Sequence, residues 1–311
     1  MGGYIARRGL SAAITVVLVS FVVFALIHLI PGNPAQVILG FRSTPYALAQ
    51  LSKELGLNKP LLLQYVTFWS GVAHGTMGMS LVYRIPVLSL VLPRLVVTLS
   101  LIAYSAVISL LLAVPIGTVA ALGRDKAFDQ TVRVLLIFGV AAPAFWIGTL
   151  LILLFSLKIP LFPAGGLGTG FLGHLRSLFL PALTLALWQT AILARDLRTS
   201  VITVLEQPHV DFARIQGLRE STVILRYVLR NSLVSTVTLL GINLSFLLAG
   251  AVVVETVFSV PGSGSLLVQS VAARDYPVIQ GIAFVYAVLV ILINFVTDIV
   301  YPLLDPRVRL T

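Results

Sequence analysis

Long apolar runs without a charged residue constrain this chain more than any other feature. They lie at 9–41, 95–123, 134–157, 231–254 and 276–297, and a shorter run lies at 177–194. A helix needs about 20 apolar residues to cross the hydrocarbon core of a bilayer. The shorter run reaches that length if the polar side chains at its ends extend to the interface. We therefore expect six transmembrane helices, near 9–30, 96–122, 134–157, 178–195, 232–256 and 279–302.

Composition excludes a soluble protein. The chain is 58% hydrophobic and 10% charged, with a mean hydropathy of +1.04, whereas a soluble domain carries about 25% charged residues. The runs are too long and continuous for the alternating strands of a β-barrel, and helices satisfy every backbone polar group in lipid. We expect an all-α membrane protein, folded as a single transmembrane domain over residues 1–311.

The distribution of basic residues predicts the orientation. Six spans place both termini on one side, and outside the long segment 31–95 most Arg and Lys residues fall on that side. Cytoplasmic loops carry an excess of Lys and Arg, whereas long loops translocate largely regardless of charge. Both termini are therefore expected in the cytoplasm. The cations on this side are Arg7, Arg8, Arg124, Lys126, Arg133, Arg195, Arg198, Arg214, Arg219, Arg226, Arg230, Arg307 and Arg309.

Three segments outside the spans carry local signals. The external segment 31–95 predicts two helices, one beginning at Pro45 and ending before Gly56, the other over 61–72; it is either a lid over the helix ends or a docking surface. The segment 158–177 contains prolines and glycines and is expected to be a flexible connector. In the cytoplasmic segment 196–230, Pro208 predicts the start of a helix that Gly217 interrupts, so the segment is either a protein-docking element or an ordinary positively charged loop.

Several kinds of chemistry are absent from the sequence. The chain has no cysteine, so it offers no thiolate nucleophile or thiolate metal site. None of its lysines follows a glycine, so no Walker A motif exists, and neither H-E-x-x-H nor G-x-S-x-G occurs. We expect no catalytic residue, no metal site and no nucleic-acid partner despite the net charge of +10. Energy for any transport would then come from a partner protein.

Motifs along almost the whole chain resemble the membrane subunits of dipeptide and oligopeptide ABC importers. The matching segments outside the cytoplasmic loop are Pro31-Gly32-Asn33-Pro34, Glu54-Leu55-Gly56-Leu57-Asn58-Lys59-Pro60, Pro143-Ala144-Phe145-Trp146, Leu180-Pro181-Ala182-Leu183-Thr184-Leu185, Glu255-Thr256-Val257-Phe258-Ser259-Val260-Pro261-Gly262, Arg274-Asp275-Tyr276-Pro277 and Asp305-Pro306-Arg307. The resemblance implies the type I ABC importer permease fold.

The cytoplasmic loop carries the most diagnostic part of the resemblance. The sequence Asp211-Phe212-Ala213-Arg214-Ile215-Gln216-Gly217-Leu218, followed by Val228-Leu229-Arg230-Asn231-Ser232, is similar to the family's coupling loop. In that family the positions of Asp211 and Gln216 are basic, so the charge pattern offered to an ATPase differs here. The resemblance implies that this loop seats in a groove of an ATPase around Ala213 and Gly217, with Phe212 and Leu218 as the buried anchors.

The resemblance also implies the partners. They are a homologous second permease subunit, two cytoplasmic ATPases that bind ATP and Mg²⁺, and an external substrate-binding protein, all at a prokaryotic plasma membrane. The substrate would be a peptide, or another small solute of the same family such as glutathione or nickel. A secondary carrier that works without ATPases is the rival reading.

Polar residues within or beside the spans are candidates for the pathway and its gate. They are Gln189, Asn243, Glu255, Arg274, Asp275 and Asn294. Intramembrane polar groups also hydrogen-bond helices to one another, and Glu255, Arg274 and Asp275 also suit a structural ion pair at the base of a loop. Both readings stay open at this point.

Overall fold

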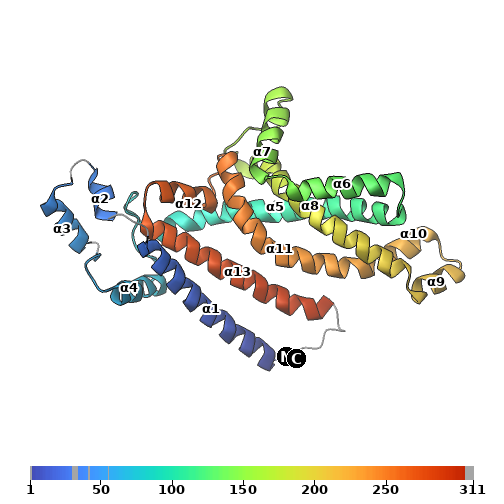
Figure 1. Cartoon of the computed structure of the whole chain (residues 1–311), viewed down its shortest axis with the longest axis horizontal. Coiled ribbons are helices and arrows are strands. Elements are labelled where there is room, and N and C mark those ends of the chain that lie inside the picture. The colour runs from blue at the N-terminus through green and yellow to red at the C-terminus, as the bar shows by residue number, and fades with distance from the viewer. Residues whose placement is uncertain (1, 30–33, 41–42, 55, 305–311) are drawn as a thin grey trace. The chain divides into compact units, whose positions relative to one another are not determined.

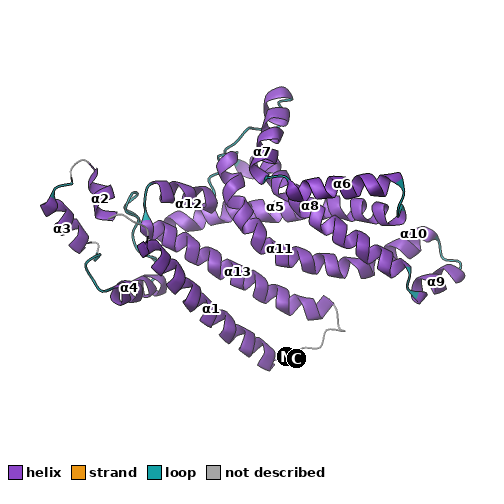
Figure 2. Ribbon diagram, viewed as in Figure 1, coloured by secondary structure: helices purple, strands orange, loops and turns teal. Residues whose placement is uncertain are grey.

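The protein is helical in every part that the structure describes. The computed structural model describes residues 2–29, 34–40, 43–54 and 56–304 (Figure 1, Figure 2). Within these residues the backbone forms helices and connecting turns, with one isolated antiparallel bridge between Met79 and Pro86. The all-α prediction is confirmed. The predicted motifs at 31–33 and 305–307 lie outside the described residues.

The chain divides into two compact units, residues 1–98 with 261–292 and residues 99–260 with 293–311. The first unit contains α1 (Gly2–Leu29), α2 (Pro34–Leu39), α3 (Pro45–Glu54), α4 (Leu61–Ala73), the start of α5 (Val87–Leu122), α12 (Ser263–Ala272) and most of α13 (Tyr276–Leu304). The second contains the rest of α5, α6 (Ala127–Ala141), α7 (Ala144–Ile152), α8 (Gly170–Leu205), α9 (Pro208–Ile215), α10 (Glu220–Thr222) and α11 (Arg230–Val257), with π-helical turns η2 (Leu153–Lys158) and η3 (Val223–Leu229).

In the first unit the helices α3 and α4 begin where the sequence predicts. The Thr44 hydroxyl accepts a hydrogen bond from the Ala47 N–H at 3.3 Å, next to Pro45, and Pro60 precedes α4. Helix α4 packs on α1 through Tyr65, whose hydroxyl lies 2.7 Å from that of Ser20. The apolar core of this unit is formed by Val87, Val91, Leu266, Val278 and Ile282.

In the second unit α8 is the central helix. It packs against α6, α7 and α11, and it is the most deeply buried of the apolar helices. It also continues to Leu205, so the first ten residues of the predicted loop 196–230 are helical. The end of α8 therefore lies just before α9 in the chain.

Among the residues that the structure describes, five helices are long and apolar enough to cross a membrane: Arg7–Ala25, Val87–Leu122, Gly170–Leu205, Glu220–Val257 and Tyr276–Asp298. The third predicted span, expected as one helix over 134–157, is instead a pair of helices, Ala127–Ala141 and Ala144–Lys158, bent by 104°. Pro143 causes the break, because proline cannot donate a helix hydrogen bond and forces extended backbone on the residue before it; Ala142 has φ −72° and ψ 130°. Counting the pair as one span gives six.

The prediction of a flexible connector over 158–177 is wrong. Helix α8 already begins at Gly170, and the residues before it are held by specific contacts. The Gly166 N–H donates to the Phe258 carbonyl at 2.9 Å, the Arg176 guanidinium donates to the Leu161 carbonyl at 2.9 Å, and the ring of Phe162 stacks on Phe179 with centroids 4.6 Å apart.

Candidate functional site

The segment between α8 and α11 folds into a short helix closed by a tight turn. Pro208 occupies the first turn of α9, where its missing N–H costs nothing. Gly217 ends the helix with φ +74° in open space, a left-handed conformation that residues with a Cβ adopt at a cost. The Gly217 N–H donates to the Arg214 carbonyl at 2.9 Å. The predicted helix start and interruption are both confirmed.

One face of α9 is buried against the end of α8. Val210 and Ala213 are buried in an apolar cluster with Ala121 of α5, with Leu197, Val201 and Val204 of α8, and with Val223 and Val228 of η3. Because residues three apart share a helix face, this pair fixes the orientation of the short helix. The position of α9 is therefore set by α8 and η3.

The other face of α9 presents large apolar side chains to the outside. Phe212 is 61% exposed and Ile215 is 82% exposed, and their spacing of three residues places them side by side. Leu218, which the resemblance names with Phe212 as an anchor buried in the ATPase groove, is partly buried within this chain, against the cluster around Val210 and Ala213. Ile215 takes its place on the exposed face; its spacing from Phe212 was the sequence signal.

Charged side chains brace the turn at Gly217. The Arg214 guanidinium donates to Glu220 at 2.7 Å, across the turn, and lies 3.8 Å from Asp211. The hydrogen bond to Glu220 raises the pKa of Arg214 above its ordinary value, so this side chain stays charged at any physiological pH. Gln216, between Arg214 and Glu220 in the sequence, is exposed. Asp211 lies in the first turn of α9, where the helix dipole favours a negative charge.

Arg230 and Asn231 lie at the junction of η3 and α11, and both are exposed. The Asn231 side-chain amide donates to the Tyr227 carbonyl at 2.7 Å. The sequence-predicted site residues from Asp211 to Asn231 are thus gathered in the second unit at the end of α8.

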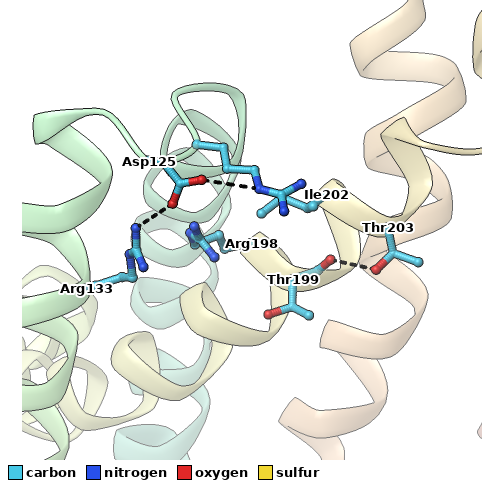
Figure 3. A pocket seen from close by; sticks show the side chains of 7 residues that line it. Asp125, Arg133, Arg198, Thr199, Ile202 and Thr203 are labelled. Carbon is cyan, nitrogen blue, oxygen red and sulfur yellow. Dashed lines mark hydrogen bonds and ion pairs between the residues drawn. The ribbon is translucent and has the colours of Figure 1, made fainter.

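A polar pocket of about 330 Å³ lies beside this end of α8. Its lining residues are Arg124, Asp125, Arg133, Arg198, Thr199, Ile202 and Thr203 (Figure 3). Arg133 and Arg198 come close together near Asp125 in this view, and Asp125 is 3.0 Å from the Arg133 guanidinium. Arg124 reaches Glu206, the residue that follows α8, at 2.9 Å. The lining has three arginines and one aspartate, and Glu206 and Asp129, which also bind these arginines, bring the carboxylates to three. The pocket is therefore a network of ion pairs rather than an anion site.

A fully buried carboxylate, Asp129 of α6, lies behind this pocket. Arg198 Nε and Nη2 donate to its two oxygens at 2.5 and 2.6 Å, a bidentate pair that joins α6 to α8. Arg133 and the Asp125 N–H complete the shell at 2.9 and 3.0 Å. Sequence reasoning missed this pair because its members lie 69 residues apart and each looks like an ordinary charge at a span end.

The pathway candidates within the helices have different environments. Gln189 is fully buried in α8, and within the described residues neither its amide nitrogen nor its oxygen has a hydrogen-bond partner. Asn243 of α11 is buried, and its amide nitrogen also has no hydrogen-bond partner among the described residues. Glu255 is fully buried near the end of α11, whereas Asn294 of α13 is exposed.

Asp275 belongs to a structural contact in the first unit. It is 1% exposed and accepts hydrogen bonds from the Ser80 hydroxyl at 2.5 Å and from the N–H groups of Leu81 and Val82 at 3.1 and 3.2 Å. Arg274 beside it is exposed and has φ +53°. Asp275 therefore anchors the turn at 80–83.

Known proteins similar to this chain are membrane components of transport systems. Residues 113–310 match the family described as binding-protein-dependent transport system inner membrane component. Residues 1–102 match the N-terminal part of the same kind of membrane component. Together the two matches span nearly the whole chain.

Relatives with high coverage carry permease names. A Brucella abortus (strain 2308) protein with the provisional name of peptide transport system permease is 38% identical over 99% of both chains. The dipeptide transport system permease DppB of Escherichia coli K12 is 34% identical over 94% of both. The glutathione transport system permease GsiC of E. coli O6:H1 is 36% identical over 99% of both.

A solved structure shares the fold. It is a crystal structure of an amino acid ABC transporter with histidines, with a TM-score of 0.54 and 16% identity, covering 68% of this chain and 93% of that one. The chain is a multi-pass protein of the inner membrane and has the type I permease fold. It belongs to the family of binding-protein-dependent transport system inner membrane components, the permease subunits of ABC importers.

Proposed function

We propose that this chain forms half of the translocation pathway of an ATP-driven peptide importer. Its partners would be a homologous second permease, two ATPases that bind ATP and Mg²⁺, and an external substrate-binding protein. The observation that carries the proposal is α9: one face is buried on the end of α8, and the other presents Phe212 and Ile215 to the outside. Exposed aromatic and aliphatic anchors on a rigid mount are typical of protein–protein contacts.

The contact with an ATPase has a defined chemistry. Phe212 and Ile215 would enter an apolar groove, and Arg214, held beside Glu220, would lie at its rim. Asp211, Gln216, Gly217, Arg230 and Asn231 would border the same contact. Because Ala213 is buried in the cluster on α8, a displacement of α9 by the ATPase is passed to α8 and hence to the membrane-spanning helices.

The topology supports the same assignment. The basic residues around α9 belong to the side of the chain with most of the Arg and Lys residues, which the positive-inside rule places in the cytoplasm. Both termini then lie in the cytoplasm, and the turn at 80–83 held by Asp275 lies outside. That turn and the helices α3 and α4 are the surface available to a substrate-binding protein.

Peptides are the proposed substrate class because relatives named for peptide and dipeptide transport cover this chain almost completely. Glutathione is the second candidate, since a relative named as a glutathione permease is 36% identical over 99% of the chain. Both substrates share peptide bonds and charged termini. The family is a transport component and not an enzyme, so hydrolysis of ATP is left to the ATPases.

The test is purification of the tagged chain from its host in mild detergent, with mass spectrometry of what accompanies it. We expect a homologous permease and P-loop ATPases. In proteoliposomes, the complex with its binding protein should take up a labelled dipeptide only when ATP is present; labelled glutathione in the same assay separates the two substrates. A chain that purifies alone and transports without ATP would show a secondary carrier instead.

A further inference from the structure

Helix α6 is fixed to α8 at two places, one near each of its ends. At one end the buried Asp129 carboxylate holds Arg198 through two hydrogen bonds of 2.5 and 2.6 Å. Further along, a Cβ on Gly139 would lie 3.1 Å from the Cβ of Ala191, so the methyl group of Ala191 packs closely against the Gly139 backbone. The two α6 positions are ten residues apart, about 15 Å along a helix. Contacts at both ends of such a segment leave it little freedom to move apart from α8.

The end of α6 at Asp129 is also close in the chain of contacts to the apolar cluster that buries α9. Leu197, which precedes Arg198, belongs to the apolar cluster that buries Val210 and Ala213. Ala213 of α9 and Leu197 of α8 thus share one apolar cluster, and Arg198, the next residue of α8, holds Asp129. Beyond Ala141 the path continues through the break at Pro143 into α7, which lies at a 104° bend to α6.

Burial makes the pair suited to transmit movement. Asp129 is fully buried and Arg198 is 16% exposed, and Arg133 and the Asp125 N–H also donate to Oδ2 of the carboxylate. The forked geometry of an arginine–carboxylate pair defines both distance and orientation. The neighbouring Arg124–Glu206 pair, by contrast, is more than half exposed at both side chains, which weakens its hold.

We propose that Asp129 is a positioning residue for transport: by clamping α6 to Arg198, it makes α6 and α8 move as one body, so that the displacement of α9 reaches the bent α6–α7 span. The inference rests on the proposed function, because it requires that an ATPase moves α9. It adds a residue outside the coupling segment, on a different span, that sets how efficiently ATP hydrolysis is converted into transport.

The test measures peptide taken up per ATP hydrolysed by the assembled complex in proteoliposomes. Asp129→Asn keeps the size of the side chain and removes its charge. Asp125→Asn is the matched control, because Asp125 lines the same pocket and contacts Arg133 but is 71% exposed. We expect the ratio to fall about tenfold in Asp129→Asn and to stay near the wild-type value in the control. An unchanged ratio in Asp129→Asn overturns the inference.

A variant series covers the case in which Asp129→Asn fails to assemble. Arg198→Lys keeps the positive charge but loses the fork, and it should lower the same ratio without loss of the complex. Because the chain has no cysteine, Asp129→Cys with Arg198→Cys also offers a clean pair for a short thiol cross-linker. Uptake per ATP should be low before cross-linking and restored after it.

Two results separate the inference from the function on which it rests. If the cross-link stops uptake, α6 and α8 must part during transport and the clamp is wrong, while the importer assignment stands. If the wild-type complex itself shows no ATP-dependent uptake, the proposed function fails first.

Discussion

The Asp275 carboxylate and the Ser80 hydroxyl, 195 residues apart in the sequence, are joined by a hydrogen bond of 2.5 Å. The same carboxylate accepts from the N–H groups of Leu81 and Val82, and the Ser80 hydroxyl oxygen accepts from the Tyr83 N–H at 2.9 Å. One buried acid thus orders a whole turn of the segment between α4 and α5. The turn presents Val82 and Tyr83, which are 51% and 44% exposed.

Removal of this acid should loosen the turn. Asp275→Ala leaves a hydroxyl and two N–H groups without their acceptor, at a cost of about 1.5–3 kcal/mol for a hydrogen-bonded charged group. We expect a lower melting temperature and faster proteolysis at 80–85. Arg274→Ala, at the exposed neighbour, should change neither. Equal proteolysis of the two variants would mean that Asp275 does not hold the turn.

The exposed face of α9 should be required for coupling and not for folding. Phe212→Asp places a charge where an apolar groove is proposed, so we expect the ATPases to be lost on purification, or their hydrolysis to continue without uptake. Phe171→Asp is the control, since Phe171 is 78% exposed at the opposite end of α8. Wild-type uptake from Phe212→Asp would contradict the assignment of α9.

Substitutions at Gly217 can show whether coupling depends on the backbone conformation of this turn. Its φ of +74° with open space around it means that a substitution there meets backbone strain and no clash. Asn tolerates the left-handed region whereas a β-branched residue does not. Gly217→Val should therefore reduce uptake strongly and Gly217→Asn only slightly, at equal amounts of complex. The reverse order, or equal uptake, would show that the left-handed turn is not required.

The ion pairs Asp129–Arg198 and Arg214–Glu220 have similar lengths but should contribute differently to the free energy of unfolding. Asp129→Ala removes one member of a buried pair and leaves Arg198 unpaired, which costs about 3–5 kcal/mol. Glu220→Gln breaks the exposed pair with Arg214 and should cost about 0–1 kcal/mol, less at high salt. Thermal unfolding of the purified complex in low and high salt measures both. A larger loss for Glu220→Gln would contradict the burial argument.

Hydropathy and turn chemistry predicted much of the fold. Pro45 and Pro208 marked helix starts, and Gly217 marked the end of α9, because proline and glycine act locally on the backbone. The bend after Ala141 was missed although Pro143 was visible, because the hydropathy of a segment does not change when its direction does. The extension of α8 through Asp196 to Leu205 was missed for a related reason: charge marks the membrane boundary, not the helix end.

The parts of the candidate site that depend on contacts between residues far apart in the sequence could not be predicted. Asp129 and Arg198 read as separate charges at span ends, and only the packing of α6 on α8 joins them. Ile215 lies three residues from Phe212, a spacing that places the two on one helix face, but the resemblance names Leu218 as the second anchor. The burial of Val210 and Ala213 fixes the rotation of α9 and so confirms that Phe212 and Ile215 face outward.

Site-specific cross-linking from α9 would show whether this helix meets an ATPase. The chain lacks cysteine, so Phe212→Cys can carry a single thiol-linked photo-cross-linker in the assembled complex. Illumination should join this chain to an ATPase, and the adduct should change in yield when ATP is added. An ATPase adduct from Phe171→Cys, with none from Phe212→Cys, would contradict the claim that α9 is where the permease meets its ATPase.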